Sequence, residues 1–177
     1  MSVSGYWHQS ILPVEFTAAH WQEALGSALV VPSIQNSLAY AGLATCLALV
    51  IGTAAAWVIT RSDLRSRHLL DTLTMLPLAV PGFVLALGYL SLSQEGKPFA
   101  ILVGAGGSPF LLLSVAYAIR RLPYVTRAAC AGLQQCDPAL EMAARSMGAS
   151  LWSTWRRITL PLLAAHLAAG AVLAFAF

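Results

Sequence analysis

The residues best suited to specific chemistry lie in one charged stretch, 137–162, which sits between two apolar segments. Asp137 is a good helix N-cap, and Pro138 suits the first helical position. Glu141 falls in the first turn, where the helix dipole favours negative charge. Glu141 and Arg145, four apart with the acid first, can form an ion pair worth roughly 0.3–0.5 kcal/mol. These groups can position a short helix and bind a partner, and we do not expect them to act in catalysis.

Glycine and proline divide the stretch into two short helices. Gly148 ends the first helix, and Ser150 can cap a second helix over Leu151 to about Thr159. Pro161 is expected to separate that second helix from the apolar run that follows. The first helix carries a narrow apolar face with the spacing i, i+3, i+4 and i+7, formed by Leu140, Ala143, Ala144 and Met147. Because two of these four residues are alanines, the face suits close contact with a partner.

Catalytic motifs are missing from the sequence. It contains no G-x-x-x-x-G-K-[ST] loop, no H-E-x-x-H and no G-x-S-x-G, so we expect a chain that is not an enzyme and binds no cofactor. The three cysteines, Cys46, Cys130 and Cys136, are an odd number without the short spacing of a zinc site. We therefore expect no disulfide framework and no metal site, and nothing indicates a nucleic-acid-binding module.

The composition is that of an integral membrane protein. Of 177 residues, 58% are hydrophobic and 10% are charged. Long runs without charge predict four spans, at about Asn36–Ile59, Leu69–Leu90, Phe99–Ile119 and Ile158–Phe177. The second span is interrupted by Pro77, Pro81 and Gly82, which makes it the best candidate to line a pathway. The third has a glycine-rich first part and is expected to be re-entrant or broken there.

The basic residues indicate the orientation of these spans. Lys97 stands alone in the turn after the second span, whereas the other nine fall in two loops on the opposite side: Arg61, Arg65, Arg67, Arg120, Arg121, Arg127, Arg145, Arg156 and Arg157. Positive residues are concentrated in cytoplasmic loops of membrane proteins. The arginine-rich loops, including the stretch 137–162, are therefore expected in the cytoplasm.

At this point the residues resemble a family, the permease subunits of binding-protein-dependent ABC importers. Their EAA loop has the motif Glu-Ala-Ala, three residues, Gly, nine residues, Ile-x-Leu-Pro. The same spacing occurs here in Ala143-Ala144, Gly148 and Ile158-Thr159-Leu160-Pro161. Met142 stands where the motif has glutamate, and the acid, Glu141, is one position earlier. The ferric-iron, phosphonate and polyamine branch is further resembled by Arg120 to Tyr124, Arg127, Leu76-Pro77 and Pro81-Gly82.

The resemblance implies an all-α, MetI-like transmembrane helix bundle in a bacterial inner membrane. Residues 1–32 would be an extracytoplasmic lead-in, and 33–177 a permease domain that contains the EAA loop 137–161 and is incomplete at its C-terminus. The partners would be a dimer of a cytoplasmic ABC ATPase that uses ATP and magnesium, a second permease half or subunit, a periplasmic solute-binding protein and the lipid bilayer. The residues coupled to the ATPase would be Glu141, Ala143, Ala144, Met147, Gly148, Ile158, Leu160 and Pro161.

Several alternatives stay open from sequence. Ferric iron and phosphonates lead among the solutes, followed by polyamines or thiamine, since no ring of charges inside the spans indicates a solute. A membrane scaffold that only anchors partners does not need Ala143, Gly148 and Pro161 at the motif spacing. A membrane enzyme is disfavoured because polar groups at membrane depth are scarce. His166, inside the fourth span, either serves function or stays neutral and hydrogen-bonds a neighbour.

Overall fold

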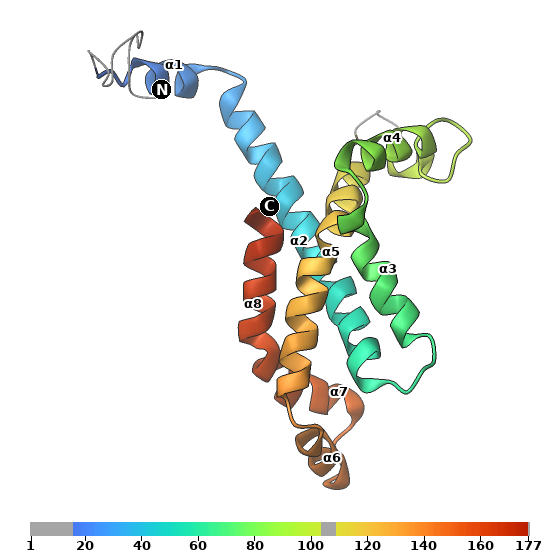
Figure 1. Ribbon diagram of the computed structural model, residues 1–177. Helices are drawn as coiled ribbons and strands as arrows, with labels where there is room; N and C mark the ends of the chain where they lie inside the picture. The colour runs from blue at the N-terminus through green and yellow to red at the C-terminus, as the bar shows by residue number, and fades with distance from the viewer. Residues whose placement is uncertain (1–15, 104–108, 177) are drawn as a thin grey trace, which may run out of the picture. The chain divides into compact units, whose positions relative to one another are not determined.

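The computed structural model describes residues 16–103 and 109–176, and the regular elements of these residues are helices (Figure 1). An all-α fold is thus confirmed for this part of the chain. Two units are compact in themselves, residues 1–39 and 40–177. The elements are α1 Ala19–Gly26, α2 Val30–Arg61, α3 Arg67–Ala79, α4 Gly82–Leu92, η1 Ala100–Leu102, α5 Phe110–Gln135, α6 Pro138–Ser146, α7 Leu151–Thr154, η2 Trp155–Thr159 and α8 Leu160–Ala176.

Helix α5 is the centre of the larger unit. It packs against α8 on one side and against α3 on the other, as Figure 1 shows. Small residues let the helices approach closely, because a Cβ atom on Gly52 of α2 would lie 2.9 Å from Val125 of α5. The buried core between α2, α5 and α8 includes Ala56, Ala129 and Leu163. This packing fixes the ends of three helices from which the charged loops extend.

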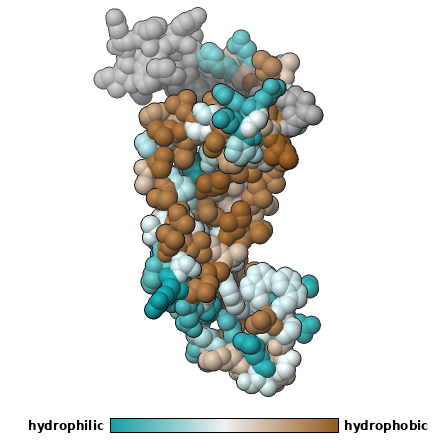
Figure 2. Space-filling view, turned by 90° about the vertical axis from the view of Figure 1, so that its right-hand side faces the viewer, coloured by the Kyte–Doolittle hydropathy of each residue, from teal (hydrophilic) through white to brown (hydrophobic). Residues whose placement is uncertain are grey.

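Long apolar helices support insertion in a membrane. Among the described residues, Val30–Arg61 and Leu151–Ala176 are each long and apolar enough to cross a bilayer. A third crossing is possible only if α3 and α4 count as one bent span. Figure 2 shows a broad hydrophobic band on one face, with hydrophilic residues above it and also below it, toward the end where Figure 1 places α6 and α7. A span count of four stays a prediction, since α5 carries Arg120 and Arg121 near its middle and Arg127 in its second half.

The second expected span, Leu69–Leu90, is not one straight helix. Helices α3 and α4 meet at a bend of 103°. Pro81 restricts the residue before it to extended backbone, and Val80 has ψ of 127°. The third expected span, Phe99–Ile119, also differs, because η1 lies near its start and α5 begins only at Phe110. Gly104, Gly106 and Gly107, where we expected a break, lie outside the described residues.

The expected break at Pro161 is wrong. Residues Leu151–Ala176 form one helix of 26 residues, made of α7, the π-helix η2 and α8. Proline lacks the N–H that an α-helical hydrogen bond would use and crowds the preceding turn. A π-turn is wider than an α-turn, and η2, Trp155–Thr159, ends two residues before Pro161. The local widening explains how the helix continues past the proline.

Candidate functional site

Helix α6 begins as the sequence predicts. The carboxylate of Asp137 accepts a hydrogen bond from the N–H of Ala139 at 2.8 Å, Pro138 is the first helical residue, and Glu141 lies in the first turn. A capping carboxylate satisfies a backbone donor that has no partner within the helix, and its charge suits the helix dipole. Since α5 ends at Gln135, the cap fixes the start of α6 directly after α5.

Gly148 forms the turn between α6 and α7. Its φ is +87°, in the left-handed region that costs residues with a side chain about 1–2 kcal/mol. The N–H of Gly148 donates to the carbonyl of Arg145 at 3.0 Å, which closes the end of α6. Ser150 then caps α7, because its Oγ accepts a hydrogen bond from the N–H of Ser153 at 3.2 Å. These contacts match the helix, glycine, helix arrangement that the sequence predicts.

The side chains of α6 divide between two opposite faces. One face lines a cavity within the chain: Pro138, Glu141, Met142 and Arg145. At about 100° per residue the opposite side of the helix, which we call the outer face, is formed by Leu140, Ala143 and Met147. All three are exposed, and Met147 is exposed to 88%. Ala144, which we expected on the same face, is half-buried. The outer face is thus open to a partner.

The cavity behind α6 has a volume of about 1180 Å³ and lies between α2, α6, α7 and α8. Its lining is mostly apolar, and the indole rings of Trp152 and Trp155 stack there with their centroids 5.2 Å apart. Its charged lining residues are Arg61, Glu141 and Arg145. The tryptophan pair was not predicted as part of this site, although its spacing of three on a helix was a signal for a contact between the two rings.

Arg61, the last residue of α2, joins the loop to the helix bundle. Its Nη2 lies 3.4 Å from Oε1 of Glu141 and donates a hydrogen bond to the carbonyl of Cys136 at 2.9 Å. The hydroxyl of Thr159 lies 3.4 Å from the same Oε1. The expected pairing of Glu141 with Arg145 is therefore wrong among the described residues, where Glu141 pairs with Arg61. Sequence reasoning missed Arg61 and Thr159 because no local pattern links them to Glu141.

The other residues of the EAA-like motif lie where η2 meets α8. Ile158 is half-buried, and Leu160 is half-buried and lines the same cavity as Glu141. Pro161 is exposed. The structure therefore brings Glu141 and Leu160 to one cavity, whereas Gly148 and the outer face point away from it.

Pro77, Pro81 and Gly82, the predicted pathway residues, lie at the bend between α3 and α4. Pro77 is inside α3, and Pro81 directly precedes Gly82, the first residue of α4. A Cβ atom on Gly82 would overlap the guanidinium group of Arg120, so a side chain at this position would displace the end of that arginine. The cavity behind α6 is lined by none of the three residues. The predicted pathway residues and the cavity behind α6 are thus separate places in the fold.

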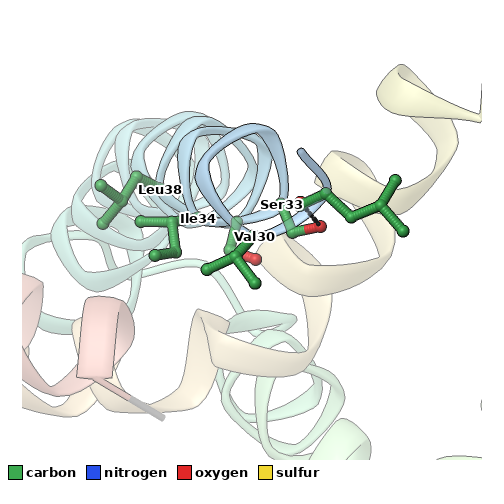
Figure 3. A pocket seen from close by; sticks show the side chains of 6 residues that line it. Val30, Ser33, Ile34 and Leu38 are labelled. Carbon is green, nitrogen blue, oxygen red and sulfur yellow. Dashed lines mark hydrogen bonds between the residues drawn. The ribbon is translucent and has the colours of Figure 1, made fainter. Parts of the chain in front are cut away.

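A smaller hollow of about 350 Å³ lies within residues 1–39. Val30, Ile34 and Leu38 follow one another along one side of α2, and Ser33 donates a hydrogen bond to the carbonyl of Leu29 at 2.7 Å (Figure 3). The residues that line this hollow include no titratable side chain. Its polar lining side chains are the hydroxyl groups of Ser33 and Ser37.

Comparison with known proteins adds a family to this geometry. The family described as binding-protein-dependent transport system inner membrane component matches residues 24–177. A ferric transport system permease protein of Haemophilus influenzae is 38% identical over 81% of this chain and 22% of its own length. A sulfate transport system permease protein of Escherichia coli is 32% identical over 89% of this chain and 58% of its own length. A molybdenum transport system permease protein of Escherichia coli is 35% identical over 79% of this chain and 63% of its own length. The chain thus spans between about a fifth and two thirds of these relatives.

Proposed function

The chain belongs to the family of binding-protein-dependent transport system inner membrane components, and from this premise we propose that it is the membrane-spanning permease component of an ATP-driven ABC importer. In this role it passes a small solute across the bacterial inner membrane. The observation that carries the proposal is the exposed outer face of α6, which ends at the left-handed Gly148. A chain that only anchored partners would not need this left-handed glycine turn at the motif spacing.

The outer face is the docking surface for a cytoplasmic ABC ATPase in this proposal. The outer face consists of exposed apolar side chains, those of Leu140, Ala143 and Met147. The short side chain of Ala143 allows close approach, as a contact with a groove requires. Closure of an ATPase dimer around ATP and magnesium would displace α6. Gly148 would hold the angle between α6 and α7, so that the displacement reaches α8 through the continuous helix Leu151–Ala176.

The solute comes to the permease from a periplasmic binding protein in this proposal. Ferric iron is weakly favoured, because the ferric permease of Haemophilus influenzae has the higher identity, 38% against 32% and 35% for the sulfate and molybdenum relatives. Phosphonates, polyamines and thiamine stay as alternatives from the motif resemblance. Within the bundle we place the pathway at the α3–α4 bend, where Pro77 and Pro81 free backbone carbonyls from helical hydrogen bonds. A second permease half or subunit completes the pathway.

Two glycines allow a matched test of coupling. Gly148 and Gly96 both have left-handed backbone, with φ of +87° and +77°, and a Cβ atom on either meets no atom within 4 Å. Gly148→Val and Gly96→Val therefore impose similar backbone strain in two different loops. In proteoliposomes with the complete transporter, Gly148→Val should uncouple ATP hydrolysis from solute uptake, whereas Gly96→Val should leave the uptake per ATP unchanged. Equal effects of the two variants would overturn the coupling role.

A further inference from the structure

We infer that Arg61 and Glu141 form a brace between α2 and α6, and that Glu141 is a positioning residue of the docking loop rather than a contact for the ATPase. The inference deepens the proposed function and rests on it. Its basis is the direction of the Glu141 side chain, which lies on the cavity face of α6, opposite to the outer face. A carboxylate on that face points toward its own chain.

The contacts of the brace join four segments of the chain. Arg61 ends α2, and its guanidinium meets both the carbonyl of Cys136, at the end of α5, and the carboxylate of Glu141 in α6. The hydroxyl group of Thr159 in η2 contacts the same carboxylate oxygen of Glu141. The ends of α2 and α5, the start of α6 and the end of η2 therefore meet around one ion pair.

Burial makes this ion pair more than a surface contact. The side chains of Arg61 and Glu141 are exposed to only 14% and 16%, and Thr159 is exposed to 1%. Nε of Arg61 is buried and makes no hydrogen bond among the described residues. Removing one partner of a buried pair leaves a charge without compensation, which is strongly unfavourable, whereas removing both partners costs much less. Arg145 lines the same cavity but does not replace Arg61 as the partner of Glu141.

The brace gives α2 a part in coupling. Helix α6 is short, with nine residues, and its outer face would be moved by the ATPase. With Glu141 held by Arg61, a displacement of α6 also pulls on the end of α2. Without the pair, α6 can move while α2 stays in place. ATP would then be hydrolysed without the complete conformational change of the helix bundle that moves the solute. The expected defect is therefore in uptake per ATP, and not in the binding of the ATPase.

A double-mutant cycle in the complete transporter tests this role. The variants are Glu141→Gln, Arg61→Gln and both together, with Arg61→Lys as the conservative replacement. We expect each single Gln variant to retain the ATPase on purification but to lower uptake per ATP. The double variant should be no worse than either single variant, and Arg61→Lys should recover part of the loss.

Asp71 and Arg127 supply a matched control pair. Their side chains lie 3.3 Å apart between α3 and α5, and they are more exposed than the brace residues. Asp71→Asn and Arg127→Gln should leave uptake per ATP unchanged. The inference is overturned if Glu141→Gln loses the ATPase on purification, if the effects of the two brace variants multiply, or if uptake per ATP does not fall.

Thermal unfolding of the purified chain in detergent separates this inference from the proposed function. Each single Gln variant should lower the Tm, and the double variant should not lower it further. If the unmodified transporter does not couple uptake to ATP, the proposed function fails, and the Tm cycle still decides whether the brace exists. If the Tm effects add, the brace is absent whatever the transport assay shows.

Discussion

Gly132 of α5 lies directly against His166 of α8, because a Cβ atom on Gly132 would stand only 2.9 Å from Cγ of the imidazole ring. The histidine that we weighed as a functional intramembrane group is therefore part of a helix crossing. Its Nδ1 is buried and makes no hydrogen bond among the described residues. The contact favours a packing role for His166, and the glycine opposite it makes room for the ring.

The first prediction concerns this crossing. Gly132→Val should place two methyl groups against His166 and destabilise the chain by about 1–3 kcal/mol, the usual cost of overpacking. Thermal unfolding in detergent measures the loss. Adding His166→Ala should recover part of it, since the smaller side chain leaves space for valine. If the double variant is less stable than Gly132→Val alone, the proposed steric conflict is not the cause.

The second prediction compares two helical glycines. A Cβ atom on Gly170 would lie 3.0 Å from Cβ of Ala128 and 3.3 Å from Cα of Val125, whereas one on Gly42 meets no atom within 4 Å. Gly170→Val should therefore cost about 1–3 kcal/mol, because the backbone of α5 cannot move aside easily. Gly42→Val should change the stability much less. Equal losses for both variants would show that α5 and α8 are not packed as described.

The third prediction concerns the start of α6. Asp137→Ala removes the carboxylate that accepts from Ala139, which should cost about 1 kcal/mol. The loss should appear as faster hydrogen exchange in α6, with α5 unchanged. Asp63→Ala is the control, because Asp63 is an exposed residue of the loop between α2 and α3. Unchanged exchange in α6 after Asp137→Ala would show that the cap does not hold this helix.

The fourth prediction is the orientation of the loops. In a background without native cysteines, Arg145→Cys should react with a membrane-impermeant maleimide from the cytoplasmic side, and Lys97→Cys from the opposite side. Both native side chains are exposed, so reagent access does not depend on unfolding. Labelling of right-side-out and inverted vesicles distinguishes the two sides. Labelling of Arg145→Cys from the outside would remove the basis for contact with a cytoplasmic ATPase.

Local signals explain why the docking loop was predictable. Each of three features depends on residues only a few positions away: the cap at Asp137, the turn at Gly148 and the cap at Ser150. Local sequence patterns can therefore predict them. Two predictions from the same stretch failed for reasons that are not local. Glu141 forms its ion pair with Arg61 of another helix and not with the nearby Arg145. The helix continues past Pro161 because the π-turn before it accommodates the proline.

Close helix packing was only partly visible in the sequence. Among the small residues of the helices, Gly52, Ala56 and Gly170 lie at helix contacts. Gly42 faces open space instead, and other small residues are exposed: Cys46, Ala165 and Ala169. Composition shows that a helix can be approached closely, but which side is approached depends on its neighbours. The same limit applies to the bend at Pro81, whose position was expected but whose angle was not.

The most direct measurement of the central claim is a cross-link from the outer face of α6. In the assembled, ATP-hydrolysing transporter, Met147→Cys should cross-link to the ATPase subunit with a short thiol reagent. Met142→Cys, on the cavity face of the same helix, is the control and should cross-link far less, although Met142 is also exposed. Efficient cross-linking from Met147→Cys alone is the predicted result. No cross-link from Met147→Cys, or an equal one from Met142→Cys, would contradict the account.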